Sequence, residues 1–246
     1  MDKSLINQCL YNWLGYGNPN AMTWFVGTEE AGAEFHGNNK TLEHEESMLI
    51  RSEFNLAMDF RYVWEELYKL PLEGFKGKRV WHYMAVFLLN SDNSHEIKNY
   101  IFNYKKLGRT NSNHFLCELL PLPKPSKGRI EPYKHFWRSI TDYHDEVLPK
   151  RIDLILNTLS SNQKVKLIVC YESLFVGEVV KRYNIMILEE CNNEHYCLYL
   201  WQFSKGRTIF LLSTPFFGQS RSKKLTLSYK GLKETAIHTK RTIQNK

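Results

Sequence analysis

Four short apolar segments constrain the fold of this chain more than any other feature. They span residues 22–26, 113–120, 164–170 and 207–212, and each is typical of a buried β-strand. Stretches with apolar residues at helical spacing separate them, of which the longest is predicted over 41–70. Alternation of this kind predicts a single α/β domain over 1–246, a three-layer α/β/α sandwich with a central, mainly parallel four-stranded sheet. The turn at 192–194 adds a small antiparallel hairpin before the last strand.

Unusual loops follow three of these predicted strands. The first reads Gly27-Thr-Glu-Glu-Ala-Gly32, in which the strand breaks at Gly27 and two carboxylates follow. The second, residues 121–128, has three prolines in five residues, and Lys124, Ser126, Lys127 and the following Arg129 are its donors. The third covers residues 213–224. Ligands of open α/β sheets bind just outside the carboxyl ends of strands, so chemistry is expected here. Solvated acids and a rigid surface connection are the alternatives.

Basic charge is concentrated at one end of the sequence. The net charge is +7, and residues 204–246 contain ten Lys or Arg against one acid, which gives +9 there and −2 elsewhere. This segment indicates a polyanion-binding protein, with a solubilising basic tail as the alternative.

The remaining composition excludes several classes of protein. The five cysteines include no Cys-x-x-Cys pair, which argues against zinc or an iron–sulfur cluster and for a reducing compartment. The sequence has no apolar run of about eighteen residues and no signal-peptide core at its start. We therefore expect a cytoplasmic protein without metal, cofactor or membrane contact, and a monomer.

The three strand-end loops resemble those of the uracil-DNA glycosylase superfamily in order and approximate spacing over residues 20–225. In that family a Gly-x-Asp-Pro-Tyr, Gly-Glu-x-Pro-Gly or Gly-x-Asn-Pro-Gly loop ends the first strand. A strand end with Asn runs into prolines, and a His-Pro-Ser or Asn-Pro-Ser loop ends the last strand. The corresponding segments here are Gly27–Gly32, Glu118–Pro123 and Thr214–Arg221.

The resemblance implies roles for individual residues. Glu29 or Glu30 would be the catalytic acid, and Thr214 stands where many members have a catalytic His. The base pocket would include Gly27, Ala31, Gly32, Phe35 and Glu118. Contacts to DNA, with an apolar wedge at Phe216 and Phe217, would come from Pro123, Lys124, Ser126, Lys127, Pro215, Phe216, Phe217, Ser220, Arg221 and Lys223.

Two departures from the family pattern point to the substrate. Ala31 replaces a Tyr that excludes bases substituted at C5, so a larger C5 group would fit. Glu118 replaces an Asn, and an ionised carboxylate only accepts hydrogen bonds, which suits the exocyclic amine of cytosine. These features favour a C5-modified cytosine of phage DNA, excised in antiviral defence.

The resulting hypothesis is a DNA glycosylase that flips a base out of double-stranded DNA and releases it hydrolytically. A monofunctional enzyme is expected because no lysine nucleophile is predicted near the loops; Lys124 is the nearest. Uracil excision, a non-catalytic DNA or nucleotide sensor of the same fold, and an unrelated small-molecule enzyme or interaction protein are the alternatives. Thr214 cannot carry a positive charge, which favours the sensor.

Overall fold

The computed structural model describes residues 2–29, 42–74, 79–124, 129–191, 196–217 and 227–246. The chain forms two compact units of mixed α/β structure. Unit 1 comprises residues 1–21, 27–71 and 108–164, and unit 2 comprises residues 22–26, 72–107 and 165–246. None of the helices in these ranges is long and apolar enough to cross a membrane.

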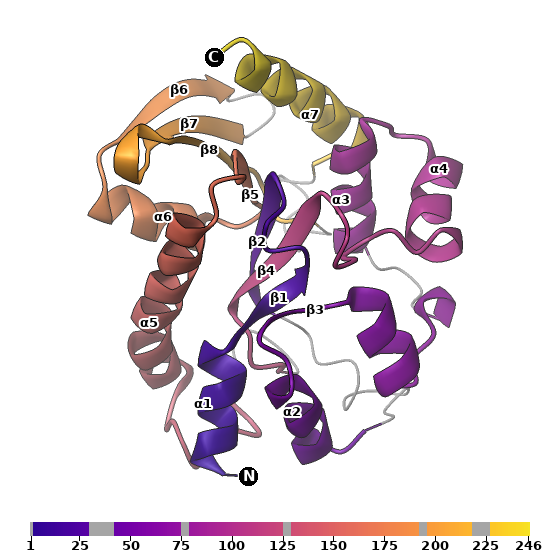
Figure 1. Cartoon of the computed structure of the whole chain (residues 1–246), viewed down its shortest axis with the longest axis vertical. Coiled ribbons are helices and arrows are strands. Elements are labelled where there is room, and N and C mark those ends of the chain that lie inside the picture. Colours follow the sequence, from indigo (N-terminus) through magenta and orange to yellow (C-terminus); the bar gives the residue numbers. More distant parts are fainter. Residues whose placement is uncertain (1, 30–41, 75–78, 125–128, 192–195, 218–226) are drawn as a thin grey trace. The chain divides into compact units, whose positions relative to one another are not determined.

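Unit 1 is built around three strands in the order β3-β1-β4. Its elements are α1 (Lys3–Tyr11), β1 (Trp13–Gly17), α2 (His44–Ser52), β3 (Leu56–Met58), the π-helical turn η2 (Tyr62–Leu67), β4 (His114–Leu120) and α5 (Ile140–Ser161), shown in Figure 1. Strand β1 runs parallel to β3 and antiparallel to β4. A Cβ at Gly15 would lie 1.8 Å from the Leu116 carbonyl oxygen, so only glycine permits this approach of β1 to β4.

The centre of unit 1 is held by a buried arginine. The Arg151 guanidinium, on α5, donates hydrogen bonds to main-chain carbonyl oxygens of α1, β1 and β4, namely those of Leu10, Trp13, Leu119 and Glu118. The side chain is fully buried, and burial lowers its pKa. One cation thereby satisfies carbonyls from three elements, which fixes the helix against the strands.

Unit 2 contains a sheet in the order β2-β5-β8-β7-β6. Its strands are β2 (Thr23–Glu29, of which 27–29 belong to unit 1), β5 (Leu167–Cys170), β6 (Ile185–Cys191), β7 (Tyr196–Gln202) and β8 (Thr208–Ser213). The other elements are η3 (Leu72–Gly74), α3 (Arg79–Leu89), α4 (Ser94–Lys98), η4 (Asn99–Asn103), α6 (Ser173–Arg182), η5 (Ser204–Gly206) and α7 (Tyr229–Gln244). Helices α3 and α7 pack side by side (Figure 1).

Two parallel strands of unit 2, β5 and β8, end at the level of Val26 in β2. Strands β2, β5 and β8 are parallel, and Val26, Cys170 and Ser213 stand opposite one another in register. Strands β7 and β6 continue the sheet in antiparallel fashion. The carboxyl ends of three parallel strands therefore share one edge, as the sequence predicts for strands followed by functional loops.

Several predicted elements are confirmed and others are wrong. An α/β structure is present, the four predicted strands form β2, β4, β5 and β8, and the predicted hairpin is β6–β7. The count of four strands is too low, because the described residues contain eight. The long helix over 41–70 does not form. Leu56, with φ of 64°, begins β3 in the middle of that stretch, and a left-handed residue cannot continue a right-handed helix. The prediction of a single domain stays a prediction.

Candidate functional site

A buried ion pair joins the ends of two strands in unit 1. Glu29 is the last residue of β2, and Lys124 follows β4 by four residues. The Lys124 Nζ lies 2.7 Å from Glu29 Oε1, and the two side chains are only 1% and 5% exposed. The ammonium also lies 5.4 Å from the centre of the Tyr143 ring. Removing two charges from water is costly, and an ion pair adds little net stability in return, so such a pair at strand ends marks a candidate functional site.

His144 is the solvent-facing member of this group. Its Nε2 lies 3.6 Å from Glu29 Oε1, and its side chain is 34% exposed. The helix that carries it, α5, begins with a capping box in which Ser139 and Asp142 each bind the other's main-chain N–H. This cap fixes the first turn of α5 and hence the position of His144 on the second. The Nε2 atom that faces Glu29 is itself buried and has no hydrogen-bond partner among the described residues, so the exposed part of the imidazole lies away from the carboxylate.

Tyr143 forms an apolar wall beside the ion pair. The ring is fully buried, and it packs edge-on against Trp137 with centroids 4.9 Å apart. Burial, together with the negative charge of Glu29, raises the pKa of its phenol. The phenol therefore stays protonated in the physiological range and does not compete with Glu29 for the Lys124 ammonium.

A second hydrogen-bonded chain fixes the segment that bears Lys124. The Tyr133 hydroxyl lies 3.1 Å from the Pro123 carbonyl oxygen, to which it donates, and 2.8 Å from His44 Nε2. A phenol has one proton, so with that proton directed to Pro123, the His44 Nε2–H donates to the Tyr133 oxygen. This interaction places His44, at the start of α2, and Tyr133 beside the carbonyl that directly precedes Lys124.

The structure corrects two expectations about unit 1. Strand β2 does not break at Gly27 but continues through it to Glu29, so Glu29 ends a strand instead of lying in a loop. Residues 121–124 are buried, so Pro123 and Lys124 are not part of an exposed phosphate-binding loop. The reason is that the Lys124 ammonium is used to pair with Glu29. Lys124, expected in the phosphate-type loop as the nearest lysine, is instead buried against Glu29, and the absence of a lysine nucleophile stays a prediction.

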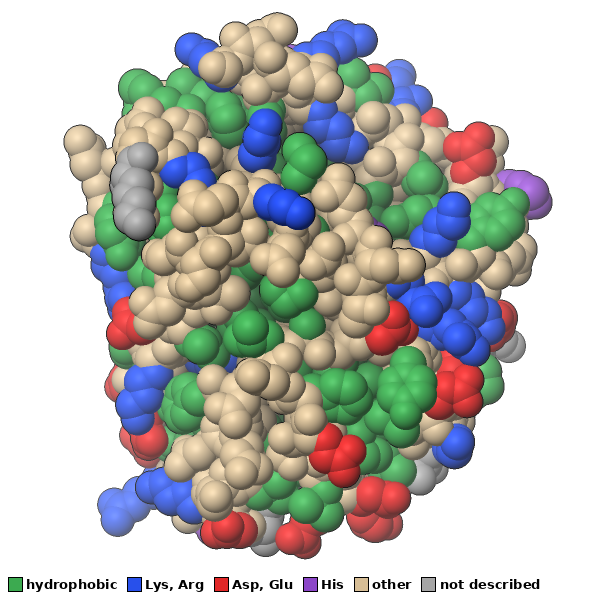
Figure 2. Space-filling view, viewed as in Figure 1, with side chains coloured by type: hydrophobic (Ala, Val, Ile, Leu, Met, Phe, Trp, Pro, Cys, Tyr) green, Lys and Arg blue, Asp and Glu red, His purple; other side chains and the backbone are tan. Residues whose placement is uncertain are grey.

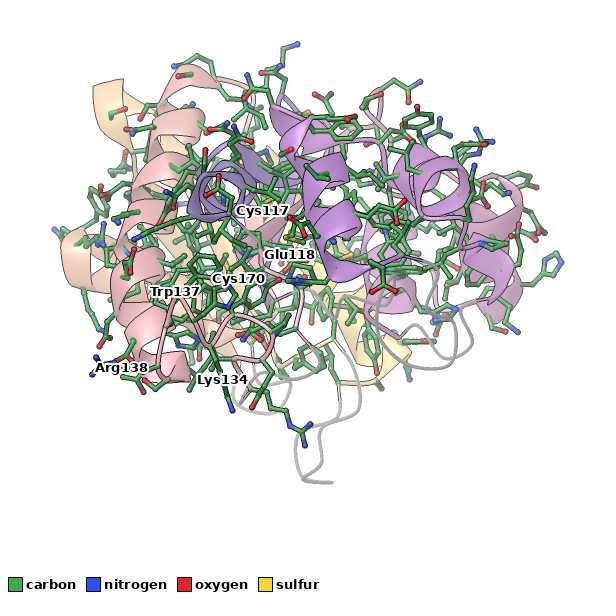
Figure 3. All side chains as sticks on the ribbon, turned by 90° about the horizontal axis from the view of Figure 1, so that it is seen from below. Cys117, Glu118, Lys134, Trp137, Arg138 and Cys170 are labelled. Atoms are coloured by element: carbon green, nitrogen blue, oxygen red, sulfur yellow. The ribbon has the colours of Figure 1, made fainter. Side chains whose placement is uncertain are left out.

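Glu118, predicted to bind the base, lies within β4. Its side chain is partly buried, and Figure 3 shows it in the interior, while Lys134 and Arg138 extend to the periphery. Its main-chain carbonyl oxygen accepts a hydrogen bond from Arg151. The role in base recognition stays a prediction.

The loop after β8, in unit 2, is anchored by aromatic packing. Phe217 is fully buried between Tyr83 and Tyr171, whose rings lie 5.6 Å and 5.0 Å away at interplanar angles of 20° and 13°. This burial fits ordinary core packing, the alternative to a wedge, and the wedge role of Phe217 stays a prediction. Phe216 is 39% exposed and stays a candidate for that contact, next to the half-buried Pro215.

Thr214 is held by main-chain contacts. The side chain is 6% exposed, its main-chain N–H donates to the Cys170 carbonyl oxygen at 2.9 Å, and its Oγ1 lies 3.1 Å from the Pro215 carbonyl oxygen. Other predicted site residues lie outside the described residues: Glu30, Ala31, Gly32, Phe35, Ser126, Lys127, Ser220, Arg221 and Lys223.

Two cations of the basic C-terminal segment have structural roles. On α7, Lys240 donates to the carbonyl oxygens of Phe87 and Leu88 at the end of α3 and to Asn90 Oδ1. Lys233 pairs with Asp92 at 2.8 Å. Other Lys and Arg side chains stand on the surface over α7 in Figure 2, and Lys230 and Arg241 are exposed. The segment is thus only partly available to a polyanion.

Sequence reasoning missed the residues that complete the unit 1 site. These are His44, Tyr133, Tyr143 and His144, together with the exposed cations Lys134 and Arg138, whereas Arg129, also exposed, is already predicted from the sequence as a donor. Their spacing in sequence carries no motif. The capping box before α5 was the one local signal that could have fixed the helical position of His144.

Among the residues that the structure describes, no group of three or more His, Cys, Asp or Glu side chains is placed to hold a metal ion. No protein-family model matches the chain, and no curated protein matches its sequence.

Proposed function

We propose that this protein is a DNA glycosylase in which Glu29 is the catalytic carboxylate. The observation that carries the proposal is the buried Glu29–Lys124 pair, which brings together the ends of the two strands that the resemblance assigns to catalysis and base recognition. The uracil-DNA glycosylase-like sandwich, with β2, β4, β5 and β8 as its four strands, belongs to the same proposal.

Glu29 would act on the sugar as the glycosidic bond breaks. Positive charge develops on the sugar ring in that step. A preorganised carboxylate therefore stabilises the transition state more than it stabilises the ground state. Lys124 is a buried partner that holds Glu29 in place. Because Lys124 is only 1% exposed, we propose that it positions the carboxylate and that water, not the amine, attacks the sugar.

His144 would assist departure of the base. The base leaves as an anion, and Thr214 cannot supply a positive charge to it. The imidazole of His144 can carry a proton, lies 3.6 Å from Glu29 and is accessible to solvent, so it is the group of this site best placed to meet a bound nucleotide.

The DNA backbone would lie against the exposed cations of unit 1. Arg129, Lys134 and Arg138 flank the segment that carries Tyr133, and their side chains are exposed. Lys134 pairs with Glu131 at the surface, an interaction that DNA phosphates can replace. The preferred substrate remains a C5-modified cytosine of phage DNA, on the grounds of Ala31 and Glu118.

The test is base release from DNA that contains hydroxymethylated or glucosylated cytosine, compared with plain and uracil-containing DNA. Mass spectrometry identifies the released base, and alkali reveals abasic sites. Release by the wild type, lost in Glu29→Gln, is expected. Release of uracil alone would retain the reaction and refute the substrate argument. No release from any of these DNAs would refute the proposed activity.

A non-catalytic DNA-binding sensor is the second candidate. It is favoured by the pairing of Glu29 with Lys124, since a neutralised carboxylate stabilises a cationic sugar less than a free one. This candidate predicts binding to DNA that weakens steeply with salt, without base release, and that is retained in Glu29→Gln.

A further inference from the structure

Tyr133 is a buried tyrosine of unit 1 whose main chain is held on both sides. Its side chain is fully buried, and its main-chain N–H donates to the Ile130 carbonyl oxygen at 2.6 Å. Its own carbonyl oxygen accepts from the N–H groups of Phe136 and Trp137, at 2.9 Å and 3.2 Å. These turns leave the backbone of Tyr133 little freedom. Its hydroxyl is therefore held at a fixed place inside unit 1.

The group that this hydroxyl contacts is the peptide unit between Pro123 and Lys124. The hydroxyl donates to the Pro123 carbonyl oxygen at 3.1 Å, and this carbonyl shares a planar peptide unit with the Lys124 N–H. The proline ring also restricts the backbone dihedral φ of Pro123. Holding the carbonyl therefore sets the plane from which the backbone of Lys124 continues.

The backbone position of Lys124 decides where its charge lies. A lysine ammonium is a compact point charge on a flexible stem, so its location depends on where the stem begins and on its partner. Here the ammonium lies 2.7 Å from Glu29 Oε1, with both side chains almost fully buried. A displaced Lys124 would leave the buried carboxylate without its counter-charge. The placement of Glu29 thus depends on the hydroxyl that holds the peptide unit before Lys124.

We propose that Tyr133 is a positioning residue for Glu29 and acts through Lys124. His44 fixes the direction of the Tyr133 proton, because its Nε2 lies 2.8 Å from the hydroxyl and the two rings pack with centroids 4.9 Å apart. A phenol has one proton, so an N–H donor at this place directs that proton to the Pro123 carbonyl. The effect on catalysis rests on the proposed function of Glu29, whereas the placement of Lys124 can be measured without substrate.

The test observes the Lys124 ammonium by NMR in the full chain, prepared with isotope-labelled lysine. Lys124→Arg identifies the signal by removing it. Tyr133→Phe keeps the ring and loses the hydroxyl, and in this variant the Lys124 signal is expected to shift or to broaden. The matched control is Tyr83→Phe in unit 2, which also removes a buried hydroxyl, one that donates to the Leu227 carbonyl oxygen at 2.7 Å. This control should leave the Lys124 signal unchanged.

The direction of the proton has its own pair of variants. His44→Gln keeps an N–H donor for the hydroxyl and should retain the wild-type Lys124 signal, whereas His44→Leu should change the signal as Tyr133→Phe does. A Lys124 signal that is unchanged in Tyr133→Phe, or that changes equally in Tyr83→Phe, would overturn the proposal. Equal signals in the two His44 variants would overturn the role of His44. Far-UV circular dichroism confirms that each variant is folded.

The catalytic consequence is measured separately, by base release. Tyr133→Phe is expected to lower kcat about tenfold and to leave KM for DNA unchanged, because a fully buried hydroxyl does not contact the nucleic acid. A raised KM with an unchanged kcat would refute the positioning role. If no form of the protein releases a base but the Lys124 signal still depends on Tyr133, the proposed activity fails and the placement of Lys124 by Tyr133 stands.

Discussion

Two loops with the same predicted role are secured by opposite means. The segment after β4 in unit 1 buries a charge, Lys124, against Glu29, while the loop after β8 in unit 2 buries an aromatic ring, Phe217, between two tyrosines. A buried ion pair loses its electrostatic stabilisation when one of the two charges is removed. A stacked ring is stabilised by the apolar surface area that it buries and by its fit to the neighbouring rings. Only the segment after β4 leaves a reactive group at the end of a strand. We therefore regard the Glu29–Lys124 pair as a candidate functional site and Phe217 as a structural anchor.

The largest effect is expected when the ion pair is broken on one side. Lys124→Met leaves the Glu29 carboxylate buried without its counter-charge and should lower the free energy of unfolding by about 3–5 kcal/mol. The double variant Lys124→Met, Glu29→Gln removes both charges and should recover most of that loss. Urea unfolding of the three proteins measures this. Equal losses in the single and double variants would show that packing, not charge, holds the segment.

Removing the anchor ring tests the other half of the comparison. Phe217→Ala should lower the free energy of unfolding by about 3–4 kcal/mol, because it leaves a cavity between Tyr83 and Tyr171. Phe216→Ala, the adjacent exposed ring, should cost less than about 1 kcal/mol and serves as the control. If the proposal is correct, Phe216→Ala also weakens DNA binding. Equal destabilisation by the two variants would contradict the described burial.

A titrating group at the start of β4 gives unit 1 a pH dependence. Nε2 of buried His114 accepts a hydrogen bond from the Gly108 N–H at 2.8 Å, and burial lowers its pKa from 6.5 to about 4. The unfolded chain binds this proton first, so stability is complete above pH 6.5 and is lost as the pH falls toward 4. The loss should reach about 3 kcal/mol.

The control for this effect is His114→Gln, which keeps an acceptor and cannot titrate. Urea unfolding at several pH values between 4 and 7 should show a smaller slope in the variant than in the wild type. An unchanged slope would assign the pH dependence to other groups.

The smallest effect on stability, with the sharpest effect on function, is expected at His144. Its side chain is a third exposed, and its Nε2 has no hydrogen-bond partner among the described residues, so His144→Gln should change stability by less than about 0.5 kcal/mol. Base release should nevertheless fall about 100-fold. The neighbouring exposed His135→Gln is the matched control and should leave both unchanged.

The sequence by itself determined the α/β class, the positions of β2, β4, β5 and β8, and the hairpin β6–β7. Short apolar runs bounded by turns are buried as strands of a sheet, whatever structure the rest of the chain adopts. It also placed Glu29 next to the end of β2, although in the following loop instead of within the strand. Strands β1 and β3 escaped notice because β1 contains two glycines within five residues and β3 is three residues long.

Only the tertiary structure decided which residues accompany Glu29. Lys124 is 95 residues away along the chain, and His144 is on a helix whose other face is buried. Sequence reasoning assigned Lys124 to phosphates and Phe217 to DNA because a cation and an aromatic ring in a loop suggest exposure. Whether such a side chain is exposed or buried depends on the groups that surround it in the folded protein. Lys124 is buried against a carboxylate and Phe217 between two aromatic rings. These partners come from distant segments of the chain.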